Sequence, residues 1–482
     1  MQSQIPNIKQ KGLFGILYFL GNSTYSAVLG LAANLAFTIF LKPAEYGLYF
    51  IVLSIMTIFG YFTDLGLAAS LVQKKNPQEE EFYTAFTIQL VLVTGVVFVG
   101  FLLTSLIVSV YHLSSEGIAL YRAMLLSLFV LSLKSIPSTR LERQLEYSKI
   151  VLTQAIENTI FYTISIALLF SNFGIYSLAI GVIVRSFVGT FFMYYFTRWK
   201  PILAFNTIHA RSILRFGIPF QSNVILAFLK DDLLNLYLAS RLGLTNFGYM
   251  GWGKKWAEAP LRIILDNTNR VLFPILSKFQ DQKNKVGGMI EKNIFYNSLI
   301  LMPIFAGAYF AMPLFVLVVP RYQKWEIAIT SFSFFLLSSL FVSFITPCIN
   351  VFNAIGKVKT SVGFMILWIF LNWLTVPLLV TTYGFTGVSV AFSINALSFL
   401  LVLYELKKHV NFRFLYAIYH PFAATACMVF VLFILSFVQF NPSLKLAATI
   451  ALGAGTYILV ILSVTKGVFI KDIVQIIREK NT

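Results

Sequence analysis

The chain has 482 residues, of which 58% are hydrophobic and only 12% charged, and its formal net charge is +18. Soluble domains carry roughly 25% charged residues, so this composition excludes an ordinary soluble protein and indicates a membrane protein. Both cysteines, Cys348 and Cys427, fall inside long apolar stretches, which argues against a disulfide framework or a cysteine-based metal site. Because motifs for ATP binding, zinc proteolysis and nucleophilic catalysis are also missing, we do not expect an ATP-driven pump, and no cofactor is predicted.

Long apolar stretches follow one another along the whole chain. A transmembrane helix needs about 20 mostly apolar residues. We identify fourteen such stretches, at 13–40, 47–70, 83–110, 118–136, 150–170, 175–197, 215–239, 247–269, 294–319, 325–350, 361–381, 385–404, 417–439 and 446–465. Each is continuously apolar, whereas the strands of a membrane barrel alternate. The sequence therefore predicts an all-α integral membrane protein with about fourteen transmembrane helices.

The basic residues predict how these helices are oriented. If the amino terminus is cytoplasmic, most lysines and arginines fall in cytoplasmic segments. The outer segments then hold only Lys42, Arg122, Arg241, Arg321, Lys324 and Lys445. This is the bias of the positive-inside rule, so we predict that both termini are cytoplasmic. The rule also explains the net charge, and no nucleic acid partner is expected.

The two halves of the chain resemble each other. At one constant spacing Asn22, Asn34 and Gly47 align with Asn223, Asn235 and Gly248, and at a second, nearby spacing Pro137 and Gly174 align with Pro347 and Gly384. An even number of helices in each copy keeps both copies in the same orientation. We therefore predict a six-helix lobe at 1–200, a second six-helix lobe at 201–410, and two additional helices with a cytoplasmic tail at 411–482.

Charged residues recur in and directly after the predicted helix at 247–269. Lys254, Glu258, Arg262, Asp266 and Arg270 are each four residues apart, which places them on one helix face, and Lys255 adds a further cation. Ionisable residues at membrane depth usually face a bundle interior or an aqueous cavity. We predict that this stripe lines a polar cavity; the alternative is that its members pair with one another and only fix the packing of the helices.

Further polar residues are predicted to line the same cavity. They are Asn223, Lys230, Asp231 and Asn235 in the helix at 215–239, together with Asn34, Asp64 and Arg185 from the first half. Lys230, Asp231 and Asp232 interrupt a stretch that is otherwise apolar enough to cross a membrane. For Asp64 the alternative is a structural hydrogen bond near its helix end, and for Arg185 it is a local packing pair.

Two segments carry a family resemblance. The stretch GYFTDLGLAASLVQKKN at 60–76 contains Asp64-Leu65-Gly66 and Gln73-Lys74, and KSIPSTRLERQLEYSKI at 134–150 contains Pro137 and Leu141-Glu142-Arg143. With these segments the chain resembles the polysaccharide-export branch of the multidrug/oligosaccharidyl-lipid/polysaccharide flippase superfamily. The resemblance implies a monomer of two six-helix lobes in the bacterial inner membrane. It also implies alternating access that moves undecaprenyl-diphosphate-linked sugar repeat units outward.

The predicted site residues suit such a cargo. Phosphate oxygens are bound by cations, here Lys230, Lys254, Lys255, Arg262 and Arg185. Sugars need amides and aromatic faces, which Asn22, Asn34, Asn223, Asn235, Tyr25, Tyr237 and Trp252 offer. The carboxylates would neutralise the empty cavity, or carry a coupled H⁺ or Na⁺. The arginines of 134–150 are interpreted mainly as orientation determinants, with capture of the diphosphate as the alternative.

Two other functions are compatible with parts of this pattern. An ion-coupled multidrug or cation exporter of the same superfamily would share the duplication, but usually lacks the last two helices. A membrane glycan polymerase or ligase would also be polytopic, but such enzymes tend to carry a large outer loop, which this sequence lacks. For a flippase, a glycan polymerase is instead a candidate partner.

Overall fold

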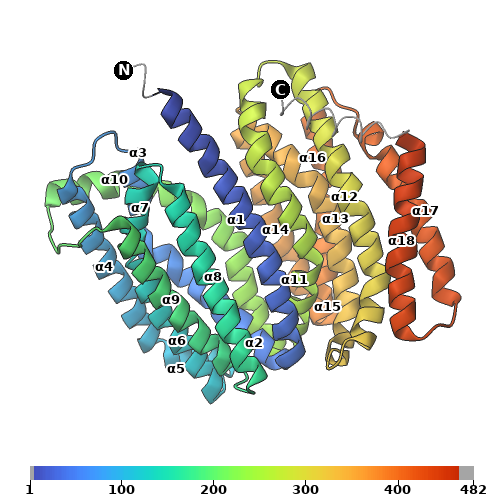
Figure 1. The fold of residues 1–482 in the computed structure, drawn as a ribbon, viewed down its shortest axis with the longest axis horizontal. Coiled ribbons are helices and arrows are strands. Elements are labelled where there is room, and N and C mark those ends of the chain that lie inside the picture. Colours follow the sequence, from blue (N-terminus) through green and yellow to red (C-terminus); the bar gives the residue numbers. More distant parts are fainter. Residues whose placement is uncertain (1–4, 466–482) are drawn as a thin grey trace. The chain divides into compact units, whose positions relative to one another are not determined.

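The structure is a computed structural model that describes residues 5–465, without the side chains of 5–17, 19–20, 220, 222–227, 230, 266 and 270–271. Over the described residues the chain is helical and contains no strand, which confirms the predicted all-α class (Figure 1). By its internal contacts the chain divides into two compact units, Met1–Gly248 and Tyr249–Thr482.

The first unit contains short and long helices in sequence. They are α1 (Ile5–Phe40), α2 (Pro43–Asp64), α3 (Leu67–Gln73), α4 (Glu79–Leu102), α5 (Thr104–Tyr111), α6 (Ser115–Ser132), α7 (Ser135–Arg143), α8 (Tyr147–Phe170), α9 (Tyr176–Thr197), α10 (Thr207–Ala227), the π-helical turn η1 (Phe228–Asp232) and the beginning of α11 (Leu233–Lys278). The lobe boundary predicted at residue 200 comes from the sequence repeat rather than from packing, and it stays a prediction.

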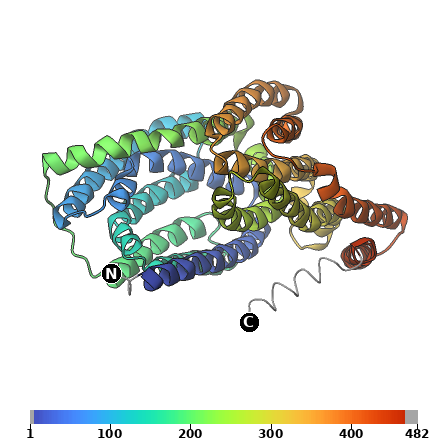
Figure 2. The same cartoon turned by 90° about the horizontal axis from the view of Figure 1, so that it is seen from above.

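The second unit holds the rest of α11 and all later helices. These are α12 (Lys283–Val318), the 3₁₀ turn η2 (Gln323–Ala328), α13 (Ile329–Ala354), α14 (Val358–Tyr383), α15 (Phe385–Ala396), α16 (Phe399–Lys407), α17 (Phe414–Phe437) and α18 (Pro442–Thr465). The last two helices pack against α12 (Figure 2). The Tyr457 hydroxyl of α18 donates to the carbonyl of Leu299 on α12 at 2.7 Å.

Twelve helices among the described residues are long and apolar enough to cross a membrane, so the predicted number of fourteen is not confirmed. Two predicted spans, 215–239 and 247–269, are not among these twelve helices. They fall on α10, η1 and α11, and they contain most of the charged residues that we predicted to line a cavity. Both ranges are helical. Between them Gly243 has a non-helical backbone, with φ 69° and ψ 169°, so α11 consists of two helices that meet at a kink.

Small residues allow close helix contacts in the first unit. On α9, a Cβ added to Gly181 would lie 2.2 Å from Ser165 Oγ of α8. A Cβ added to Gly189 would lie 2.0 Å from Glu157 Oε1 of the same helix α8. At the end of α2, Leu65 and Gly66 adopt positive φ angles, and a Cβ on Gly66 would lie 2.5 Å from the carbonyl oxygen of Gly217. Such close backbone approach through small residues is typical of helices packed in membranes.

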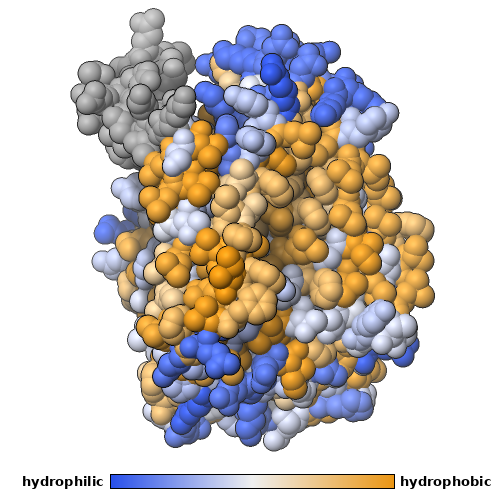
Figure 3. Space-filling model, turned by 90° about the vertical axis from the view of Figure 1, so that its right-hand side faces the viewer, coloured by the Kyte–Doolittle hydropathy of each residue, from blue (hydrophilic) through white to orange (hydrophobic). Residues whose placement is uncertain are grey.

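The surface of the second unit carries a hydrophobic band. On the face that includes α17 and α18, hydrophobic residues lie between hydrophilic residues at the two ends (Figure 3). Phe422, Phe430 and Phe433 of α17 and Leu459 of α18 are among the exposed apolar side chains. A large exposed apolar surface is unfavourable in water and is expected where a protein faces lipid.

Candidate functional site

The charged stripe of α11 consists of interacting side chains. Arg262 Nη2 lies 2.8 Å from Glu258 Oε2, and Lys254 Nζ lies 4.0 Å from Glu258 Oε1. Lys254 Nζ also lies 4.8 Å from the ring centroid of Phe392 on α15. Two cations thus share one carboxylate, while Lys255 is exposed and the Arg262 side chain is 66% exposed. Asp266 and Arg270, the other predicted members of the stripe, have side chains outside the described residues.

Trp252, which the sequence suggested as a surface for sugars, is fully buried in the second unit. Its ring stacks on Trp325 at 5.6 Å, and its Nε1 donates to the Tyr322 hydroxyl at 3.2 Å. Trp252 is therefore a core residue in this structure, and no face of its ring is available to a ligand.

The charged trio at 230–232 lies in the π-helical turn η1. The Tyr61 hydroxyl of α2 donates to Asp232 Oδ2 at 2.6 Å, and Gln221 Nε2 of α10 donates to the carbonyl of Tyr61 at 3.0 Å. Asp231 is exposed and Asn235 half-buried, whereas the side chains of Asn223 and Lys230 lie outside the described residues. Single π-helical turns inside α-helices are frequent at functional sites.

We expect Tyr61→Phe to destabilise the protein by about 1.5–3 kcal/mol, because it removes a hydrogen bond to a carboxylate. Thermal unfolding of the purified protein in detergent measures this change. Tyr195→Phe is the matched control, since Tyr195 is exposed and only its ring makes described contacts. Equal melting temperatures for the two variants would show that the Tyr61–Asp232 bond does not hold η1 against α2.

Arg185 belongs to a buried charge cluster that the sequence did not reveal. Glu157 of α8, only 2% exposed, forms ion pairs with Lys134, between α6 and α7, and with Arg185 Nε of α9, the latter at 4.0 Å. The Arg185 guanidinium also lies 5.7 Å from the ring centroid of Phe161. As on α11, two cations share one carboxylate, so each cluster carries an excess of positive charge.

The other predicted residues of the first half make local hydrogen bonds. Asp64 Oδ1 accepts a hydrogen bond from the backbone N–H of Ala68 at 3.2 Å. This contact favours the alternative stated for Asp64, a structural hydrogen bond near its helix end. Asn34 is buried and its Oδ1 accepts from the Tyr46 hydroxyl at 2.7 Å. Nearer the amino terminus, α1 and α8 are joined by the pairs Asn22–Gln154, Ser26–Asn158 and Tyr25–Thr159.

The two arginines of the basic segment 134–150 hold neighbouring elements together. Arg140 Nη1 lies 2.5 Å from Glu79 Oε2 at the start of α4. Arg143 donates to the carbonyls of Leu71, Val72 and Lys74, at the end of α3, and to that of Lys75. These contacts favour a structural role for both arginines over capture of a ligand.

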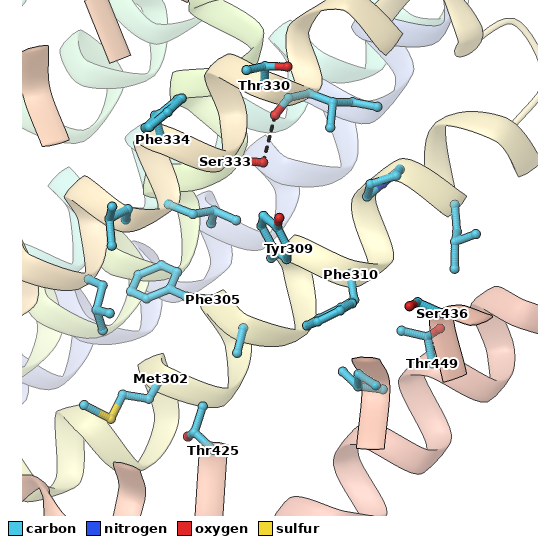
Figure 4. Close-up of a pocket in the computed structure, with 18 of the residues that line it drawn as sticks. Met302, Phe305, Tyr309, Phe310, Thr330, Ser333, Phe334, Thr425, Ser436 and Thr449 are labelled. Carbon is cyan, nitrogen blue, oxygen red and sulfur yellow. Dashed lines mark hydrogen bonds between the residues drawn. The ribbon is translucent and has the colours of Figure 1, made fainter. Parts of the chain in front are cut away.

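A mostly apolar cavity of about 890 Å³ lies in the second unit, between α12, α13, α17 and α18. Phe305 and Tyr309 line it from α12, Phe334 from α13, and Ser436 and Thr449 from α17 and α18 (Figure 4). Its size and lining suit an apolar chain rather than a sugar.

Comparison with known proteins identifies relatives over most of the chain. It is 25% identical over 457 residues to a membrane protein in the cps region of Klebsiella pneumoniae, covering 90% of this chain and 91% of the relative. It is 24% identical to the lipopolysaccharide biosynthesis protein WzxC of Escherichia coli K12, over 76% of this chain and 74% of that protein.

Solved structures share the fold at low sequence identity. The lipid II flippase MurJ in an inward closed conformation superposes with a TM-score of 0.78 at 17% identity, covering 95% of this chain and all of MurJ. An inward-facing multidrug resistance transporter of the MATE family superposes with a TM-score of 0.60 at 16% identity, covering 79% of this chain and 98% of the transporter. These likenesses confirm the expected fold.

The model of one protein family, described as polysaccharide biosynthesis protein, matches residues 37–329, which is more than half of the chain. Together with WzxC, this match confirms the resemblance to the polysaccharide-export branch of the superfamily. The chain belongs to the polysaccharide biosynthesis protein family.

Proposed function

We propose that this protein is a flippase that moves undecaprenyl-diphosphate-linked oligosaccharide repeat units from the cytoplasmic to the outer leaflet by alternating access. Its membership of a polysaccharide biosynthesis family supports a role in surface polysaccharide export. The name of WzxC, a lipopolysaccharide biosynthesis protein, supports the same cargo class.

The observation that carries this proposal is the cation-rich stripe of α11. Lys254 and Arg262 share the single carboxylate of Glu258, and Arg262 remains largely exposed. A diphosphate is a multivalent anion, and guanidinium and ammonium groups form its strongest hydrogen bonds. In our proposal Arg262 holds the diphosphate, Lys254 and Lys255 add charge, and Glu258 neutralises the stripe when the cargo is absent.

The other predicted site residues extend this proposal. Asp231 and Asn235 lie in and just after the η1 turn, and Arg185 and Asn34 contribute a cation and an amide from the first half. Asn223, Lys230 and Asp266 belong to the proposed set by their positions in the sequence. The apolar cavity beside α17 and α18 is suited to part of the polyisoprenoid chain of the same lipid.

A multidrug or cation exporter is the second function compatible with the fold. Two observations favour the flippase. The excess of cations on α11 would repel a cationic drug. The MATE transporter superposes on 79% of this chain, whereas MurJ superposes on 95%.

We also infer the setting in which the protein works. The distribution of basic residues supports cytoplasmic termini. The bacterial membrane relatives support a location in the bacterial inner membrane. We propose a monomer, H⁺ or Na⁺ as a coupling ion carried by a carboxylate, and a glycan polymerase as a partner that receives the exported repeat units.

The function is tested by following a labelled undecaprenyl-diphosphate oligosaccharide across the bilayer of proteoliposomes. We expect protein-dependent movement that falls about tenfold or more in Arg262→Ala, because a charge-assisted hydrogen bond is worth about 1.5–3 kcal/mol. Glu258→Gln should reduce it less. Arg262→Lys should be intermediate, since an ammonium keeps the charge but loses the planar bidentate geometry.

Arg211→Ala is the control, because Arg211 is an exposed arginine on α10 outside the stripe. Each variant must first show a normal melting temperature and normal membrane insertion. Small and equal effects of Arg262→Ala and Glu258→Gln would indicate a packing pair instead of a cargo site. Absence of movement by the folded wild-type protein would contradict the flippase and favour the exporter, which a screen of labelled cations would then detect.

A further inference from the structure

A second cavity of the second unit, of about 680 Å³, lies beside the first turns of α12. Asn284, Gly288 and Glu291 line it from one face of α12, and Tyr416 lines it from α17. The remaining wall is Lys407, the last residue of α16, and the loop at 410–413. This cavity is polar, in contrast to the apolar cavity farther along α12.

The loop at 410–413 is held in place by its own side chains and backbone. Val410 and Phe412 are buried in the apolar core of the unit, whereas Asn411 and Arg413, which alternate with them, are exposed. A Cβ on Gly287 would lie only 1.8 Å from the carbonyl oxygen of Asn411, which shows direct backbone packing of α12 on the loop. The walls of the cavity are therefore fixed without a ligand.

The cavity carries an excess of positive charge. Lys407 and Arg413 are both exposed, and in the part of the chain that the structure describes neither forms an ion pair. The single carboxylate, Glu291, accepts a hydrogen bond from the backbone N–H of Arg413 at 2.5 Å and so stabilises the start of α17. The two cations, the amides of Asn284 and Asn411 and the hydroxyl of Tyr416 are all able to donate hydrogen bonds to a phosphate group.

The surroundings of the cavity favour a phosphate that belongs to a lipid. Directly after Arg413, α17 presents Leu415, Tyr416, Tyr419 and Phe422 as exposed side chains. Tyrosines in such positions mark the boundary between headgroups and hydrocarbon. The acyl chains of a lipid held at the cavity would lie along these side chains, whereas a soluble anion would gain nothing from them.

The geometry points to a binding site for an anionic phospholipid of the cytoplasmic leaflet, with its phosphate between Lys407 and Arg413. Basic pockets between helices on the cytoplasmic side recognise anionic lipid headgroups. The inference uses the orientation proposed above, but it does not depend on what the protein transports. The site binds a lipid of the surrounding bilayer.

Native mass spectrometry of the purified full-length protein, titrated with phosphatidylglycerol or phosphatidylcholine, tests this site. We expect the protein to prefer phosphatidylglycerol. The preference should fall about tenfold or more in the double variant Lys407→Gln/Arg413→Gln, because each charge-assisted hydrogen bond to the bound phosphate contributes about tenfold. The double variant Lys357→Gln/Lys359→Gln should keep it, since these exposed lysines lie outside the cavity on the same predicted side.

A second variant tests the cavity without changing the charge. Gly288 lines the cavity and a Cβ there meets nothing within 4 Å, so Gly288→Leu should fold and fill the site. We expect it to weaken phosphatidylglycerol binding as the charge variant does. If Gly288→Leu binds normally, or both double variants lose binding equally, the preference is a general attraction to basic residues and the site is wrong.

Competition with inorganic phosphate separates the two sources of a phosphate group. An excess of free phosphate should leave the lipid bound, because the exposed residues of α17 contribute to the affinity. Displacement of the lipid would overturn the lipid assignment and identify a soluble-anion site. Because the readout is lipid binding, either result is independent of whether labelled oligosaccharide lipids cross the bilayer.

Discussion

Gly47→Ala is expected to destabilise the protein by about 1–3 kcal/mol and to reduce transport, because there is no room for a methyl group at this position. Gly47 lies near the start of α2, and a Cβ there would be 1.9 Å from the carbonyl oxygen of Leu244. The contact is reciprocal, since a Cβ on Gly248 would lie 2.0 Å from the carbonyl oxygen of Pro43. Thermal unfolding in detergent, followed by the proteoliposome assay, measures both effects.

Two comparisons make this prediction specific. Gly60→Ala in the same helix meets nothing within 4 Å and should be neutral or stabilise the helix, since alanine is the better helix former. Gly47→Ala and Gly248→Ala disturb one contact, so the double variant should cost less than the sum of the single variants. Strict additivity, or a neutral Gly47→Ala, would contradict backbone contact between α2 and the residues after Gly243.

Glu157→Gln should have the largest effect on stability, about 3–5 kcal/mol, because it leaves Lys134 and Arg185 without their shared carboxylate. The carboxylate is almost fully buried and packs on Gly189, so water cannot readily replace it. Removing one partner of a buried ion pair is far more costly than removing an exposed charge. The melting temperature of the purified protein measures the effect.

Glu142→Gln is the control for this variant, since Glu142 is an exposed glutamate on α7. Adding Lys134→Met to Glu157→Gln should restore part of the stability by removing one unpaired cation. If Glu157→Gln melts like the wild type, the cluster does not fix the packing of α6, α8 and α9, and its cations would be available to a ligand.

The stripe on α11 shows what local sequence determines. Residues four apart lie on one face of any regular α-helix, so Lys254, Glu258 and Arg262 could be placed together without knowledge of the fold. The all-α class and the approximate positions of most spans followed in the same way, from the length and apolarity of each stretch. These features depend only on neighbours along the chain.

The π-helical turn shows where this reasoning fails. Counting helical steps from Asn223 selected Asp231 and Asn235, but η1 changes the register, and Asp232 is the residue bonded to Tyr61. A single residue inserted into a helical turn rotates every later side chain about the axis. No residue type in the sequence signals that insertion.

Composition, periodicity and the positions of basic residues by themselves determined that this chain is a helical membrane protein, which stretches are its helices, and which charges share a face of α11. Only the tertiary structure decided that Glu157 joins Lys134 to Arg185, that Trp252 is buried, that Gly47 touches Gly248, and that α12 borders two cavities of opposite polarity. The physical reason is that these features join residues far apart in the chain, and the sequence pattern of each helix leaves open which neighbouring helix its face meets.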